Sequence, residues 1–344
     1  MDQLPTPPIS NLPPFVPEPL PRRPRLAFLL LPGLDHFAQA LLDGLPGMTN
    51  HDVQAFQVTS LAAFEAALAW TDRPDIDALW FEFCWPPFPR LIGQTDFGGR
   101  RVIVRVHRIE AMETSHVADT PWHKVSDVIV VSRDMAARVA KAAPKLERTT
   151  RLHLVHNGLD PTLFVPLASW DRYRVGWCGL MTLRKNPSLA LQILFGLRVL
   201  DERYHLHICS NGGEPLATES FFHLAGRLDL LDAVHIDGRL PPSAMPAWHA
   251  RNGTLLHTSL HESFGYGIAE AASVGCDLAV LDHPGSAEFW PSATRFGTVE
   301  EAVWLIRDAA PHRWRDHVAR HFSLSRQLAA TAELLRAPAL AMAS

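Results

Sequence analysis

The feature that most restricts the fold is a regular alternation of short apolar runs and amphipathic stretches from residue 25 to about 310. The apolar runs have the length of buried strands and fall at 26–31, 53–58, 76–81, 102–106, 127–131 and 152–155, then at 174–178, 204–209, 233–236, 254–258 and 277–281. The stretches between them have helical spacing and include 61–70, 133–142, 187–199, 219–230 and 243–251. Strands that alternate with helices form parallel sheets covered on both faces, so the sequence predicts an α/β fold.

Two prolines interrupt the alternation within 159–167 and divide the strands into two sets. We therefore predict two doubly wound, Rossmann-like domains, at 25–165 and 166–310, that face each other across a cleft. Ligands of such folds bind at the carboxyl ends of the strands. Residues 1–24 are rich in proline and are expected to form a flexible arm. Helical pattern returns in 311–344, and these helices are expected to pack back on the N-terminal domain.

Composition excludes several classes of function. The chain has 344 residues and a net charge of −4 without a basic tract, which argues against nucleic-acid binding. We expect no signal peptide, and the run 26–31 is far too short to span a bilayer, so any membrane association would be peripheral. The cysteines are scattered without a C-x-x-C pair, at Cys84, Cys178, Cys209 and Cys276. This pattern favours a reducing cytoplasm and no structural zinc.

The stretch Glu262-Ser-Phe-Gly-Tyr-Gly-Ile-Ala-Glu270 places two carboxylates around a glycine-rich elbow between two predicted strands. A helix that begins at such an elbow offers free backbone N–H groups and the positive end of its dipole, which suit a phosphate or sugar hydroxyls. Gly275 is expected to cap the end of this helix, and Ser132 the start of the helix 133–142. The alternative is a pair of exposed glutamates on a surface loop and helix.

Four segments resemble, in order, the motifs of retaining family 4 glycosyltransferases, which have the GT-B fold. They are His156-Asn-Gly-Leu-Asp160 followed by Phe164, Gly179-Leu-Met-Thr-Leu-Arg-Lys-Asn186, the Glu262–Glu270 stretch, and Asp282-His-Pro-Gly-Ser-Ala-Glu288. Three segments of the first half resemble small stand-alone transferases of bacterial surface-glycan pathways: Pro32-Gly-Leu-Asp-His-Phe37, Trp80-Phe-Glu-Phe-Cys-Trp85 and Arg105-Val-His-Arg-Ile-Glu110. The resemblance implies transfer of a sugar from a nucleoside diphosphate sugar, most commonly a UDP- or GDP-sugar, to a hydroxyl of a glycan, lipid-linked or protein acceptor.

The resemblance also implies roles for individual residues. The donor diphosphate would be held by the charges of Arg184 and Lys185 and by the backbone N–H groups of Phe264, Gly265 and Tyr266. Gly33 would let the ligand approach the backbone. Glu262 would contact the transferred sugar, and Glu270 would contact the ribose. His107 would face the reaction centre from across the cleft. The catalytic residues would be His107, Glu262 and Lys185. The acceptor side would include Asp35, Glu82, Arg105 and Glu110. No bound cofactor and no metal are implied.

The residues leave alternatives open. Glu82 could instead form a structural ion pair with Arg105, and His107 could be a hydrogen-bonded core histidine. Leu180 stands where the family has an arginine, so Arg184 would have to compensate. A degenerate protein that binds nucleotide or glycan without catalysis is the main rival, and a GT-B epimerase or phosphorylase is a third reading.

Two further patterns do not predict a site. Asp75-Ile-Asp77 matches a metal-binding D-x-D pattern but follows Pro74 and reads as a loop. His205 and His207 share one strand face without a cysteine or carboxylate at ligand spacing.

Overall fold

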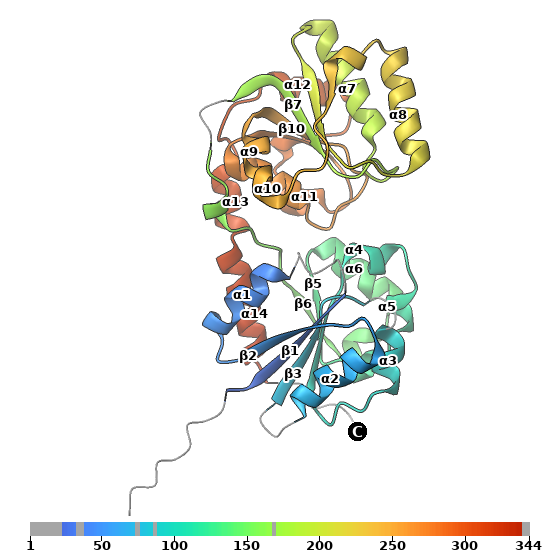
Figure 1. The fold of residues 1–344 in the computed structure, drawn as a ribbon, viewed down its shortest axis with the longest axis vertical. Helices are drawn as coiled ribbons and strands as arrows, with labels where there is room; N and C mark the ends of the chain where they lie inside the picture. The colour runs from blue at the N-terminus through green and yellow to red at the C-terminus, as the bar shows by residue number, and fades with distance from the viewer. Residues whose placement is uncertain (1–22, 32–37, 73–75, 85–87, 167–169, 339–344) are drawn as a thin grey trace, which may run out of the picture.

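The computed structural model describes residues 23–31, 38–72, 76–84, 88–166 and 170–338. Two parallel sheets of six strands lie one above the other along the long axis of the molecule, each with helices on its faces (Figure 1). This architecture confirms the predicted α/β fold with two Rossmann-like units. No helix within the described ranges is both long and apolar enough to cross a bilayer.

The N-terminal sheet has the strand order β2-β1-β3-β4-β5-β6 and is parallel throughout. Its strands are β1 (Arg25–Leu30), β2 (Asp52–Gln57), β3 (Ile76–Phe81), β4 (Arg101–Arg105), β5 (Asp127–Val130) and β6 (Arg151–Leu154). Its helices are α1 (Gln39–Met48), α2 (Leu61–Thr71), α3 (Phe88–Gln94), α4 (Arg108–Met112), α5 (His116–Asp119) and α6 (Arg133–Ala142). Alternate strand residues feed separate apolar clusters on the two faces, so the central strands are buried on both sides.

The C-terminal sheet has the order β12-β11-β10-β7-β8-β9. Its strands are β7 (Asp171–Cys178), β8 (His205–Cys209), β9 (Val234–Ile236), β10 (Asn252–His257), β11 (Asp277–Leu281) and β12 (Arg295–Phe296). Its helices are α7 (Pro187–Leu200), α8 (Pro215–Arg227), α9 (Met245–Ala250), α10 (Tyr266–Val274), α11 (Ser286–Phe289) and α12 (Val299–Arg307). Short 3₁₀ turns occur at Trp122–Lys124, Leu146–Arg148, Pro161–Leu163, Leu231–Ala233, Pro242–Ala244 and Ser292–Thr294.

The predicted apolar runs coincide with β1 to β11 to within a few residues at each end. The strand β12 was missed because two residues give no periodic signal. Both predicted caps are confirmed. The Ser132 side chain accepts from Met135 N, and Gly275 closes α10 with a φ of 96°, a left-handed conformation that glycine adopts without strain.

The last two helices pack against different units. α13 (Arg315–His321) lies against α10, where Val318 joins the apolar cluster of the C-terminal unit. α14 (Leu324–Arg336) lies beside α1 in the N-terminal unit (Figure 1). There Leu328, Leu334 and Leu335 join a core cluster. Of these two helices, α14 alone is therefore built into the N-terminal unit.

The contact between α14 and α1 is tight. A Cβ at Gly44 would lie 2.5 Å from a methyl group of Leu328, so the absence of a side chain at Gly44 lets the helices approach. We predict that Leu328→Ala lowers the free energy of unfolding by about 2–3 kcal/mol, because removal of the Leu328 methyl groups leaves a cavity against Gly44. Urea denaturation measures the change. Leu216→Ala, at an exposed leucine, is the matched control, and an equal loss in both variants would contradict this packing.

Candidate active site in the cleft between the sheets

A large cavity of about 1290 Å³ opens between the two units. Several of its lining residues follow directly on strands of both sheets, as expected where carboxyl ends of parallel strands face one another. The N-terminal unit contributes Phe83, His107 and Asn157, and the C-terminal unit contributes Gly179, Arg184, Lys185, Glu262, Ser263, Phe264, Gly265, Tyr266 and Glu270, among others. The predicted donor-side residues that the structure describes therefore all lie on one cavity.

The elbow before α10 has the geometry that the glycine-rich sequence predicts. Gly265 has a φ of 85° and precedes the helix, and a Cβ there would lie 2.8 Å from Ile268 Cδ1. Phe264 is buried among Phe289, Trp290 and Phe322, which anchors the turn from beneath. The first turn of α10 therefore directs its backbone N–H groups and the positive end of its dipole at the cavity.

Glu262 is held by two cations at the same carboxylate oxygen. Arg184 Nη1 donates to Glu262 Oε1 at 2.7 Å and Lys185 Nζ donates to it at 2.5 Å. His257 Nε2 lies 3.8 Å from this oxygen. Burial raises the pKa of Glu262, but the charges of Lys185, His257 and Arg184 outweigh burial and hold the pKa well below its ordinary value. The site therefore carries an ionised carboxylate between two positive groups.

The loop that carries the two cations is fixed by the strand beside it. Thr258 Oγ1 donates to the Lys185 carbonyl at 2.8 Å, and Leu260 N donates to the Arg184 carbonyl at 2.8 Å. Gly179 has a φ of 145°, and a Cβ there would come within 3.2 Å of the Lys185 side chain. Leu180, which stands where the family 4 motif that this loop resembles has an arginine, is half exposed. Arg184 and Lys185 are thus the cations that this loop brings to Glu262.

Glu270 lies one turn into α10 and lines the cavity with its side chain 24% exposed. The imidazole of His249 in α9 lies beside it, with Nε2 3.4 Å from Glu270 Oε2. The carboxylate is thus open to the cavity while its other side faces a fully buried imidazole. A group placed this way can accept hydrogen bonds from two adjacent hydroxyls of a polyol.

The opposite wall of the cavity is built on β3 and β4. His107 precedes α4, its ring stacks on Phe83 with centroids 4.2 Å apart, and its Nε2 lies 3.1 Å from Glu82 Oε1. Arg105 Nη1 also donates to Glu82 Oε1, at 3.0 Å, and Trp80 Nε1 donates to Oε2 at 2.9 Å. The ion pair of Glu82 with Arg105, which the sequence left open, is confirmed.

Glu82 and Glu110 lie beneath the wall rather than on it. Burial raises the pKa of Glu82, but Arg105 and His107 lower it by more than burial raises it, so the pKa lies below its ordinary value. Glu110 accepts from Cys84 N and His107 N at 3.0 Å each, and burial raises its pKa. Both carboxylates are fully buried, which favours positioning roles over the acceptor contacts expected from sequence. Gly33 and Asp35 lie outside the described residues, and so does Asp75 of the D-x-D pattern.

Arg105 also joins the two units. Its Nη2 donates to Asn157 Oδ1, and it forms a side-chain hydrogen bond with Tyr266 of α10. Tyr266 therefore ties the elbow to the buried base of the opposite wall. Asn157 belongs to the His156–Asp160 motif, although sequence reasoning gave it no individual role.

A second set of contacts across the cleft centres on the start of α6. His261 Nε2 lies 2.8 Å from Asp134 Oδ2, and Arg133 N donates to Glu288 Oε2 at 2.7 Å. His156 Nε2 lies 2.8 Å from the other oxygen of Glu288. His156, where the family has proline, is thus paired with the glutamate of the Asp282–Glu288 turn.

No protein-family model matches the chain, and no curated protein matches it in sequence. Several solved structures share its fold. Anabaena HepE in complex with UDP and glucose superposes with a TM-score of 0.70 at 17% identity, over 90% of this chain and 99% of that one. Sucrose-phosphate synthase from Thermosynechococcus elongatus gives 0.69 at 14% identity, over 91% and 98%. Staphylococcus aureus TarM gives 0.63 at 12% identity over 78% of this chain, which spans 58% of TarM. These structures show that the fold is GT-B.

The charge balance at Glu262 predicts a pH effect on stability. The folded-state pKa lies below the ordinary value of 4.5, so Glu262 adds stability that is fully present above about pH 4.5 and is lost as the pH falls below it. The stability difference between wild type and Glu262→Gln should therefore rise from acid to neutral pH. Thermal melts at several pH values measure it. Glu219→Gln, an exposed control on α8, should show a flat difference. A flat difference for Glu262→Gln would contradict the ion cluster.

Proposed function

We propose that the protein is a glycosyltransferase of the retaining, family 4-like type that moves a sugar from a nucleoside diphosphate sugar to a hydroxyl acceptor. The observation that carries the proposal is the placement of Arg184 and Lys185 beside Glu262 at the start of α10, on a cavity large enough for such a donor. Breaking the bond between sugar and diphosphate builds negative charge on the leaving phosphate. Preorganised cations and N–H donors stabilise that charge.

The residues divide the work as follows. Arg184, Lys185 and the N–H groups of Gly265 and Tyr266 bind the diphosphate. Glu262 accepts from hydroxyls of the transferred sugar, and Glu270 accepts from the ribose. His107 faces the reacting carbon from the N-terminal wall, where Glu82 fixes its ring. The leaving phosphate itself deprotonates the acceptor hydroxyl, so no protein nucleophile and no metal are needed.

UDP-sugars are the donors we favour, because HepE has been seen with UDP and UDP-glucose. The acceptor class we favour is a glycan of a bacterial surface polysaccharide, lipopolysaccharide or glycoconjugate, bound on the side of Phe83 and His107. The TarM complex holds fondaparinux and GlcNAc-glycerol besides UDP, which makes a glycan acceptor reasonable for this fold. Lipid-linked and protein acceptors belong to the same proposal. The chain would then act in the cytoplasm, at most peripherally associated with the inner face of the membrane.

The competing proposal is a protein that binds nucleotide without catalysis. Leu180 motivates it, because the loop after β7 lacks one cation there and presents a half-exposed apolar side chain instead. The two readings differ in a single observable. A transferase releases UDP from its UDP-sugar, whereas a binder retains the donor intact.

We predict that Lys185→Ala and Glu270→Ala each lower the release of UDP from UDP-glucose by at least roughly tenfold. The first removes a cation from the diphosphate and the second removes ribose contacts. Coupled detection of UDP measures the rate, with water as the acceptor of the sugar where no glycan acceptor is supplied. The exposed residues Lys141 and Glu219 supply the controls Lys141→Ala and Glu219→Ala. Turnover that is unchanged in both test variants would refute the assigned site.

A further inference from the structure

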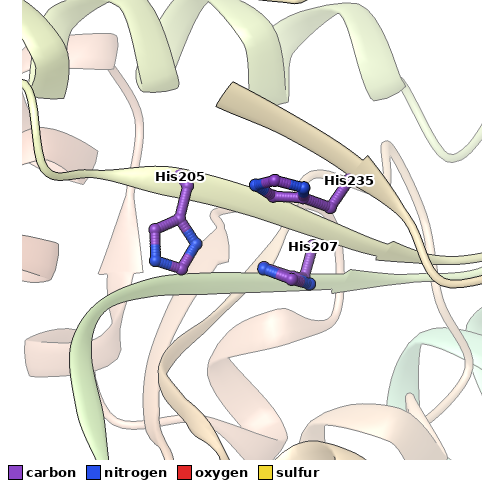
Figure 2. A group of neighbouring side chains, drawn as sticks. All are labelled: His205, His207 and His235. Carbon is purple, nitrogen blue, oxygen red and sulfur yellow. The ribbon is translucent and has the colours of Figure 1, made fainter. Parts of the chain in front are cut away.

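The second feature of interest lies on the C-terminal sheet, outside the residues that line the cleft. His205 and His207 of β8 point to the same side of the sheet, because strand side chains alternate. His235 of β9 is the register partner of His207, so it joins them on that side (Figure 2). One ring nitrogen from each histidine lies within 4.8 Å of the others. Sequence reasoning saw the pair on β8 and missed the third histidine, which only strand pairing supplies.

We infer that these three histidines form a binding site for a single divalent transition-metal ion such as Zn²⁺. Imidazole nitrogens suit Zn²⁺, Co²⁺, Ni²⁺ and Cu²⁺, whereas Mg²⁺ and Ca²⁺ need oxygen ligands. In a tetrahedral site with Zn–N bonds of 2.0–2.1 Å, the nitrogens would lie about 3.4 Å apart. Side-chain rotations must bring the nitrogens from within 4.8 Å of one another to that spacing.

Two carboxylates support the rings from behind. The two carboxylate oxygens of Asp237, Oδ1 and Oδ2, lie 3.1 and 3.0 Å from His207 Nδ1. Asp171 Oδ2 lies 3.6 Å from His205 Nε2. A carboxylate on the far nitrogen of a histidine fixes the tautomer and raises its basicity as a metal ligand. With Asp237 on Nδ1, the lone pair of His207 lies on Nε2.

His205 offers the complementary atom. Its Nδ1 is buried and has no hydrogen-bond partner among the residues that the structure describes. A buried polar atom without a partner costs free energy unless something binds it. A metal ion ligated by His205 Nδ1 and His207 Nε2 removes that cost and leaves both supporting carboxylates in place.

Arg174 is the group that competes with the ion. Its Nη1 lies 3.0 Å from His207 Nε2, while its Nε donates to Asn252 Oδ1 and its Nη2 to Asp237 Oδ2. The guanidinium thus occupies the place of a cation, so a metal ion at His207 Nε2 must displace Arg174 Nη1 from that nitrogen. Asp171 and Asp237 offset the charge of Arg174 beside the ion.

The ion would have a structural role. β9 has three residues and, among the strands that the structure describes, forms the edge of the sheet next to β8. A metal shared by His207 and His235 ties this short strand to its neighbour. His235 is exposed, which leaves the outer coordination position to water or to another ligand.

The test is Zn²⁺ titration of the full-length, tag-free chain by calorimetry, with Co²⁺ absorption as a second probe. Wild type should bind one ion and give the visible bands of nitrogen-ligated Co²⁺. His235→Ala and His207→Ala should weaken Zn²⁺ binding by at least roughly tenfold, and Asp237→Asn by roughly 10–100-fold. His223→Ala, at an exposed histidine on α8, should bind as wild type.

Arg174→Gln gives an opposite and more specific expectation. Removal of the competing cation should strengthen Zn²⁺ binding. No saturable binding by wild type, unchanged binding by His235→Ala, or weaker binding by Arg174→Gln would each overturn the inference.

Discussion

The candidate site depends on one carboxylate oxygen that accepts from two cations. Arg184 and Lys185 both reach Glu262 Oε1, and without that carboxylate two positive side chains would lie close together in a partly buried cleft. Glu262 therefore keeps them together at the start of α10 while no ligand is present. A diphosphate brings its own negative charge to the same place, so the cations can serve it without a large rearrangement.

The second requirement is that the two units face each other at a defined distance. Arg105 extends from the buried Glu82 to Asn157 and to Tyr266 on the opposite side. At another point of the cleft, the start of α6 contacts His261 and Glu288. The peptide link at 157–166 and α14 also connect the units. Polar contacts of this kind between units permit relative motion, which the proposed binding of a donor and release of products would use.

Sequence reasoning predicted what depends on local pattern. Apolar periodicity located the strands, and glycines located the elbow at Gly265, because both signals are contained in a few neighbouring residues. It did not predict what depends on distant pairing. Glu110 was expected on the acceptor side, yet its carboxylate is buried and accepts from Cys84 N, which belongs to a different strand–loop segment. Likewise, His156 pairs with Glu288 and His235 joins His207 only through contacts between separate elements.

The central claim is that the cleft binds a nucleoside diphosphate sugar through these cations. The most direct measurement is a thermal-shift screen, without metal, against UDP, GDP, ADP, dTDP, CDP and their common sugars. A ligand at 100 times its Kd should stabilise the folded chain by about 2.7 kcal/mol. The account predicts a clear shift with one base, uridine first, that Lys185→Ala abolishes. No shift with any nucleotide, or an equal shift in Lys185→Ala, would contradict it.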